Sequence, residues 1–246
     1  VVFMDGTISR LGGKTYDSEG YDLLGLITGS EGLIGSTLCK YFEKQKRSIN
    51  KLDLKFGHDL TDESFVKKWF KNNPTKYLVN CFALNDHIDK KKRKGNLYNF
   101  PLDQFSKYLE TNVTALFSVC KEFSKNNKTG SIVNFSSTYG LVSPNPKLYE
   151  ESQKNIAYCV SKGAVINLTK YLAVHLAPNI KVNCIVPGGI EFNQDRKFVS
   201  NYSKLTPMKR MMRKTELNGL INYLCSENST YVTGATLVCD GGYTVL

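Results

Sequence analysis

The chain has 246 residues, of which 41% are hydrophobic and 22% are charged, and its formal net charge is +11. This composition is typical of a globular protein with a sizeable core and excludes a largely disordered chain. It contains no run of eighteen apolar residues, so a membrane span is not expected. The positive charge attracts anions, and its densest run, at 90–94, is either a solvated loop or a rim that draws in an acidic substrate.

Short apolar runs alternate with longer amphipathic stretches, which predicts a single doubly wound α/β domain with a parallel sheet. The expected strands are 23–28, 49–54, 77–80, 131–136, 181–186 and 235–239. The expected helices are 33–44, 62–72, 103–126, 155–175 and 214–225. Asp62 begins its helix behind Thr61, a plausible cap. We expect residues 1–20 to be an extension and 21–246 to form the domain.

The seven cysteines are scattered and include no C-x-x-C pair, which favours reduced thiols and a cytoplasmic location. The three histidines lack metal-ligand spacing, so no metal site is expected.

A glycine-rich turn follows the first expected strand. Its candidate cofactor-binding residues are Gly29, Ser30, Gly32, Leu33, Ile34 and Gly35. Glycines let the backbone approach a pyrophosphate, and the next helix offers free N–H groups and the positive end of its dipole. The spacing is G-x-x-G-x-x-G rather than G-x-G-x-x-G, and a plain tight loop is the alternative. The flanking strand and helix favour a dinucleotide site.

An acidic residue, Asp53, lies near the end of the second expected strand. A carboxylate there accepts hydrogen bonds from ribose hydroxyls and repels a 2′-phosphate, so NAD is favoured over NADP. Lys55, two residues later, would soften that repulsion. Asp59 either contacts the adenine or shapes the turn before the next helix.

Tyr158 is the only one of the fourteen tyrosines with a lysine four residues later, Lys162. On a helix these positions share a face, and a nearby ammonium favours the phenolate, bringing proton exchange closer to neutral pH. The alternative is a half-buried tyrosine beside a surface lysine. Two strands that end in polar turns, one at 136–140 and one at Pro187 and Gly188, point to the same sheet edge.

Taken together, these segments resemble the short-chain dehydrogenase/reductases from residue 23 to the C-terminus. The matching segments are TGSEGLIG, Asp59-Leu60, Asn80, ETNVTALF, NFSSTYG, AYCVSKGAVINLTKYLA, IKVNCIVPGGI and YVTGATLVCDGGYT. The resemblance implies a Rossmann-like fold, NAD or NADP as cofactor, an alcohol or carbonyl substrate, and a homodimer or homotetramer.

The resemblance also implies a catalytic tetrad of Asn112, Ser137, Tyr158 and Lys162. Ser137 would bind the substrate oxygen, and Tyr158 would exchange the proton while hydride moves to or from the nicotinamide. Lys162 would hold the ribose and lower the pKa of the tyrosine, and Asn112 would organise a water-linked proton path. Ser137 is favoured over Ser136 because it stands three residues before a glycine. Further cofactor contacts are expected from Leu60, Asn80, Pro187, Gly188 and Ile190.

The chain departs from the family pattern at Asn80-Cys81-Phe82-Ala83, at Phe192, where a threonine is common, and in a longer stretch between Ser137 and Tyr158. We expect that stretch to build part of the substrate pocket. The closest resemblance is to a subgroup linked to bacterial surface-sugar and nonulosonic-acid pathways, which implies an anionic, sugar-like substrate. Steroids and acyl thioesters are the alternative substrate classes.

An oxidoreductase that transfers hydride between NAD(P) and an alcohol or carbonyl is therefore the expected function. The alternative is a non-catalytic cofactor-binding or regulatory module of the same fold, against which the intact tetrad argues. Nucleic-acid binding is not expected, because no zinc-finger, RRM or KH signature accompanies the positive charge. Membrane binding is not expected either.

Overall fold

The computed structural model describes residues 10–11, 14–15, 22–85, 97–149 and 153–246. The basic run at 90–94 and most of the expected N-terminal extension lie outside the described residues. Within the extension, Arg10–Leu11 (β1) and Lys14–Thr15 (β2) pair as short antiparallel strands. In the described part of the chain, no helix combines the length and the apolar character needed to cross a bilayer.

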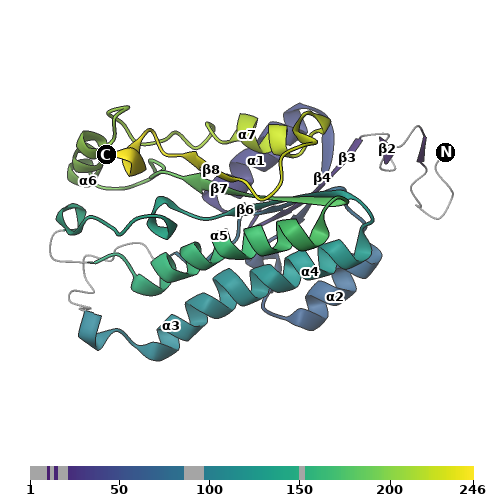
Figure 1. The fold of residues 1–246 in the computed structure, drawn as a ribbon, viewed down its shortest axis with the longest axis horizontal. Coiled ribbons are helices and arrows are strands. Elements are labelled where there is room, and N and C mark those ends of the chain that lie inside the picture. Colours follow the sequence, from purple (N-terminus) through teal and green to yellow (C-terminus); the bar gives the residue numbers. More distant parts are fainter. Residues whose placement is uncertain (1–9, 12–13, 16–21, 86–96, 150–152) are drawn as a thin grey trace.

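The centre of the domain is a six-stranded parallel sheet with the strand order β4-β3-β5-β6-β7-β8 (Figure 1). The strands are β3 (Asp22–Thr28), β4 (Arg47–Leu52), β5 (Tyr77–Asn80), β6 (Gly130–Phe135), β7 (Ile180–Pro187) and β8 (Thr236–Cys239). The order reverses at β3, whose neighbours are β4 and β5. In open sheets of this kind, ligands bind outside the carboxyl ends of the strands at such a reversal.

Helices cover both faces of the sheet (Figure 1). One face carries α1 (Leu33–Lys44) and α7 (Asn218–Leu224), and the other carries α2 (Glu63–Asn72), α4 (Leu116–Asn126) and α5 (Ile156–Leu176). Each layer closes its own hydrophobic core, because strand residues alternate between the two faces: Leu26 packs toward α2, α4 and α5, and Ile27 packs toward α1 and α7. Two further helices, α3 (Leu102–Leu109) and α6 (Arg196–Leu205), lie toward the carboxyl ends of the strands.

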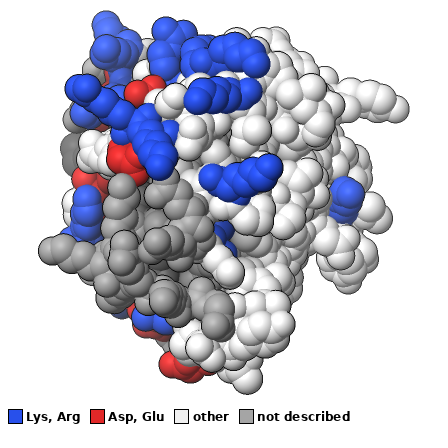
Figure 2. Space-filling view, turned by 90° about the vertical axis from the view of Figure 1, so that its left-hand side faces the viewer, with Lys and Arg blue, Asp and Glu red and all other residues white. Residues whose placement is uncertain are grey.

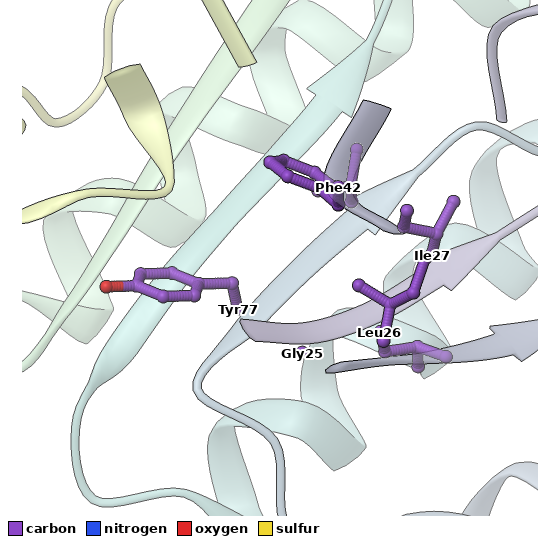
Figure 3. Close-up of a pocket in the computed structure, with 7 residues that line it drawn as sticks. Gly25, Leu26, Ile27, Phe42 and Tyr77 are labelled. Atoms are coloured by element: carbon purple, nitrogen blue, oxygen red, sulfur yellow. The ribbon is translucent and has the colours of Figure 1, made fainter. Parts of the chain in front are cut away.

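The α1 core is tightly filled. Phe42 of α1 is fully buried and packs with Ile27 of β3 and Tyr77 of β5. Figure 3 shows these side chains around Gly25, and the narrow gap between them has no room for a water molecule. Interiors packed to this degree respond to the loss of even a few atoms.

The expected strands and helices are present, with four differences. The single helix expected over 103–126 is interrupted by a π-helical segment at Glu110–Ala115, and α6 was not expected. The last expected helix begins later, at Asn218. Asp62, not Thr61, caps α2, because its carboxylate accepts hydrogen bonds from the N–H groups of Ser64 and Phe65.

Candidate active site

The glycine turn connects β3 to α1 and is sterically closed to larger residues. Gly29 has a positive φ of 65°, and a Cβ there would lie 2.6 Å from the backbone nitrogen of Phe82. A Cβ at Gly35 would lie 2.1 Å from the carbonyl oxygen of Gly29. The glycines are therefore required for the turn itself to fold against the loop after β5. This packing role is additional to the phosphate approach expected from the sequence.

At the point where a pyrophosphate would bind, the turn has N–H and hydroxyl groups without hydrogen-bond partners among the described residues. No side chain caps α1 at Gly32, and its first turn contains no acidic residue. The first N–H groups of α1, which include those of Leu33 and Ile34, therefore have no side-chain acceptor in the part of the chain that the structure describes. Beside them, the buried hydroxyl of Ser30 has no hydrogen-bond partner among the described residues. A buried unpaired hydroxyl beside an uncapped helix start fits a bound phosphate.

Asp53 stands directly after β4, and its carboxylate is held on two sides. It accepts hydrogen bonds from the N–H of Glu31 in the glycine turn (2.9 Å) and from the N–H of Lys55 (2.9 Å). The carboxylate is thereby fixed beside the glycine turn, where the adenosine ribose is expected. Lys55 itself is exposed, and the structure gives no ion pair between its ammonium and Asp53 among the described residues.

The side chains of three predicted cofactor residues bond or pack with other residues of the chain. The carboxylate of Asp59 accepts hydrogen bonds from the N–H and hydroxyl of Thr61, so it shapes the turn, one of the two roles left open by the sequence. Leu60 is buried in the α2 core. The Asn80 side chain bonds with Thr28 and Asn134 inside the sheet. Any cofactor contact from Leu60 or Asn80 would therefore have to come from its backbone.

The serine and tyrosine of the predicted tetrad meet at the carboxyl end of β6. The hydroxyl of Ser137 is hydrogen-bonded with the phenol of Tyr158. Ser136 turns the other way, and its hydroxyl donates to the carbonyl of Lys162 at 2.7 Å. Gly140 makes this contact possible, since a Cβ there would lie 2.6 Å from the Ser136 oxygen and 2.7 Å from the Lys162 backbone. The structure thus brings Ser137, and not Ser136, to the tyrosine.

Lys162 lies beneath the tyrosine ring on the same helix. Its Nζ is 5.7 Å from the ring centroid of Tyr158 and donates a 2.8 Å hydrogen bond to the Phe135 carbonyl. Burial lowers the pKa of Lys162 to about 8. Burial also raises the pKa of Tyr158 to about 12, against the smaller lowering effect of the Ser137 hydrogen bond. The expected shift of the phenol pKa toward neutrality is therefore wrong for the protein alone, because desolvation of the phenol outweighs the hydrogen bond from Ser137.

Asn112 lies within the π-helical segment and binds the loop that follows β5. Its Oδ1 accepts from the N–H of Leu84 (2.7 Å), and its Nδ2 donates to the Leu84 carbonyl (3.1 Å) and the Ser161 hydroxyl (3.0 Å). π-helical insertions often occur at functional sites. Here the insertion lets one amide join the loop after β5 to α5, one turn from Tyr158.

The turn after β7 approaches the C-terminal segment. The N–H of Gly188 donates to the Cys239 carbonyl, and a Cβ at Gly188 would lie 2.9 Å from the Cα of Asp240. Ile190 forms a parallel bridge with Met212. Beside this turn lies a cavity of about 350 Å³, and its lining includes Gly188 and Gly189 together with Tyr202, Arg210, Glu216 and Asp240. Pro187, Gly188 and Ile190 thus stand at the same strand ends as the tyrosine.

Sequence reasoning missed a chain of aromatic side chains beside Ser137. Ring contacts link, in order, Tyr139, Tyr149, Phe198, Tyr202 and Tyr243. They come from the turn after β6, the longer stretch before α5, the helix α6 and the C-terminal segment. The spacing of Phe198 and Tyr202 by four residues was the available signal for a buried helix face. Through this cluster, the longer stretch before α5 packs against α6. That the stretch also forms part of the substrate pocket stays a prediction.

Comparisons with known proteins agree with this geometry. The family model described as enoyl-(acyl carrier protein) reductase matches residues 36–244. Over 247 residues, which cover 88% of this chain and 96% of the relative, the chain is 28% identical to post-translational flagellin modification protein A of Campylobacter coli. It is 34% identical over 184 residues to D-arabinitol 2-dehydrogenase [ribulose-forming] of Candida albicans, with 65% of this chain and 63% of that protein covered.

Solved structures show the same fold. A short-chain dehydrogenase from Leptospira borgpetersenii with bound NAD+ has a TM-score of 0.77 and 29% identity, and 91% of this chain and 93% of that chain are covered. ElxO with NADP bound has a TM-score of 0.74 and 26% identity, with 90% and 98% covered. Three observations indicate the same family. They are the glycine turn at the sheet reversal, the tyrosine paired with a serine and a lysine, and the family model that matches most of the chain. The chain belongs to the short-chain dehydrogenase/reductase family.

Proposed function

We propose that this protein is an NAD-dependent dehydrogenase/reductase that interconverts a hydroxyl and a carbonyl group on a polar, anionic, sugar-like substrate. The observation that carries the proposal is the placement of Tyr158, whose phenol is paired with Ser137 and lies above Lys162 at the carboxyl ends of the strands. A Y-x-x-x-K pair that arose by accident would not also meet a serine from the turn after β6.

The chain's own residues account for binding and proton transfer. Ser137 holds the substrate oxygen close to the Tyr158 hydroxyl, and Tyr158 gives a proton to that oxygen or takes one from it. Lys162 places a positive charge under the ring and, by the family resemblance, binds the nicotinamide ribose. The nicotinamide, when bound, supplies or accepts the hydride. Asn112 keeps the loop after β5 in place beside these groups.

The preference for NAD rests on two acidic residues beside the expected ribose position. Asp53 is fixed there by its bond with the N–H of Glu31, and the side chain of Glu31 is exposed in the same turn. Two carboxylates there disfavour a 2′-phosphate, and Lys55 offsets only part of their charge. Structural neighbours contain either NAD+ or NADP, so the choice has to come from these residues.

Two observations support an anionic, sugar-like substrate. The relatives include a flagellin modification protein and a polyol dehydrogenase. The face at the carboxyl ends of the strands is rich in Lys and Arg in its upper part (Figure 2), which is the side where Figure 1 places α6. Exposed basic residues of α6 and the segment after it are Arg196, Lys197, Lys204, Lys209, Arg213 and Lys214. Such a surface raises the local concentration of anionic substrates.

We also propose a cytoplasmic homodimer or homotetramer. The outer faces of α4 and α5 leave Phe117, Val160, Tyr171 and Val174 exposed, an apolar surface that association would cover. All seven cysteines are free, as in a reducing compartment. Light scattering coupled to gel filtration tests the assembly, and a monomer at micromolar concentration would contradict it.

Cofactor binding and turnover can be tested separately. Titration with NADH and NADPH, followed by nicotinamide fluorescence, should show tighter binding of NADH. A panel of polyols, sugar acids and their keto forms should reveal turnover by the change in nicotinamide absorbance. An acyl-thioester substrate belongs in the panel as the competing chemistry.

The variant Tyr158→Phe removes only the hydroxyl group of this side chain and keeps the ring. It should reduce turnover by at least about 100-fold while NADH affinity changes little, because general acid–base catalysis contributes about 10²–10⁴-fold. Full turnover by Tyr158→Phe would refute the assigned proton transfer. Cofactor binding without turnover of any compound in the panel would favour the non-catalytic module.

A further inference from the structure

Tyr158 has a second lysine beside it that the family motif does not include. Lys154 stands just before the N-cap of α5, and its Nζ is 4.3 Å from the ring centroid of Tyr158, nearer than the Nζ of Lys162 at 5.7 Å. The same ammonium donates a 2.5 Å hydrogen bond to Oδ1 of Asn85 in the loop after β5. The cation is therefore held over the ring by groups from two separate segments.

The surroundings of Tyr158 contain little that would stabilise a negative charge. Tyr108 of α3 and Tyr139 of the turn after β6 pack around it, and the thiol of Cys159 adjoins it. None of these is positively charged. Among the described residues, Lys162 of α5 and Lys154 are the cations that lie against the ring, and Ser137 contributes the hydrogen bond.

We propose that Lys154 is a second positioning cation of the active site, which holds its ammonium against the ring of Tyr158 and favours the phenolate that removes a proton from an alcohol. A cation within 6 Å of an aromatic ring is attracted to it, and the attraction grows when the ring oxygen becomes negative. The proposal rests on the proposed role of Tyr158 as the proton-transferring group.

Lys162 alone is a weak source of positive charge at alkaline pH. It is fully enclosed and bound to a carbonyl oxygen, and burial lowers its pKa to about 8. Lys154 is less buried than Lys162, and one of its hydrogen bonds goes to the neutral side-chain amide of Asn85. The two ammonium groups repel each other, an effect that further lowers the pKa of Lys162. Lys154 therefore complements Lys162 in the range where Lys162 loses its proton.

The test measures the ionisation of Tyr158 directly and needs no substrate. The pKa of about 12 belongs to the cofactor-free protein, and the cationic nicotinamide of bound NAD+ is expected to lower it into the range of the titration. The protein is labelled with ¹³Cζ-tyrosine, saturated with NAD+, and titrated by NMR from pH 6 to 10.5. The Tyr158 signal is identified from its absence in Tyr158→Phe. Lys154→Met and Lys154→Gln remove the charge, and Lys154→Arg keeps it. Lys170→Met is the matched control, because it makes the same charge change on an exposed part of α5, about 18 Å further along the helix.

We expect the ionisation midpoint of Tyr158 to rise by about one pH unit in Lys154→Met and Lys154→Gln, to return most of the way in Lys154→Arg, and to stay unchanged in Lys170→Met. Midpoints in Lys154→Met and Lys154→Gln equal to that of Lys170→Met would overturn the proposal. So would a wild-type Tyr158 signal that keeps its phenol position throughout the range. Because NAD+ binding and panel turnover are measured separately, failure here is distinct from failure of the proposed function.

Discussion

Gly140 offers a direct test of how the catalytic turn is seated on α5. In Gly140→Ala, the new methyl group would lie 2.7 Å from the backbone of Lys162 and 2.6 Å from the hydroxyl oxygen of Ser136. The helix backbone cannot yield cheaply, so the turn that carries Ser137 has to move by about 0.7 Å to reach an ordinary contact. Overpacking of this kind costs about 1–3 kcal/mol. Misplacement of a reacting group by 1 Å costs about 100-fold in rate, so kcat should fall by roughly 10- to 100-fold.

The assay compares kcat, NADH affinity and thermal unfolding of Gly140→Ala with those of Gly219→Ala. Gly219 lies in α7, and a Cβ there meets no atom within 4 Å, so this control adds the same methyl group without a clash. It should raise stability by about 0.5–1 kcal/mol through helix propensity and leave kcat unchanged. NADH affinity should be kept in both variants. A Gly140→Ala protein with wild-type kcat would refute the claimed contact between the turn and the helix.

Three further predictions test the core, the buried lysine and the cofactor preference. Phe42→Ala should lose about 3–5 kcal/mol of unfolding free energy in urea denaturation, because Phe42 is fully buried, and a loss below about 1 kcal/mol would contradict the packing. Folding depresses the pKa of Lys162 from 10.5 to about 8, so between these values the unfolded chain binds more protons and stability rises with pH. The unfolding free energy of the cofactor-free protein should therefore increase over this window relative to Lys162→Met, and parallel pH curves would contradict it. Asp53→Asn should weaken NADH binding and shift the NADPH-to-NADH affinity ratio toward NADPH by about 10-fold, measured by fluorescence, whereas an unchanged ratio would remove Asp53 from cofactor selection.

Local sequence signals predicted most of the fold. The expected bounds of α1 and β5 agree with the structure, because an amphipathic run after a glycine and a short apolar run before a polar residue are local patterns. The π-helical segment at Glu110–Ala115 has no such pattern. It accompanies contacts between Asn112 and Leu84, which are distant in the sequence. The helix α6 was missed although Phe198 and Tyr202 stand four residues apart, because that spacing alone does not identify Tyr149, the distant partner on which the helix packs.

Motif spacing also predicted which groups meet, but not what their surroundings do. The pairing of Tyr158 with Lys162 follows from a helical repeat, the family resemblance implied Ser137, and the structure brings the three together. Desolvation is a property of the folded chain, so the direction of the phenol pKa could not be derived from the tyrosine and lysine alone. Lys154 was missed for a related reason. It precedes Tyr158 by four residues, but it lies outside the helical range, and its position over the ring depends on the loop that contains Asn85.

The burial of the tyrosine explains why positive charge has to be gathered around it. A phenol with a pKa near 12 keeps its proton at neutral pH, which is the form that donates to a carbonyl oxygen. The reverse reaction needs the phenolate, and the dry surroundings that hold the substrate oxygen against Ser137 make that anion costly. The fold therefore has to offset desolvation with cations close to the ring. Lys162 does so at the expense of its own proton affinity, and Lys154, held by Asn85 of the loop after β5, adds charge without the same degree of burial.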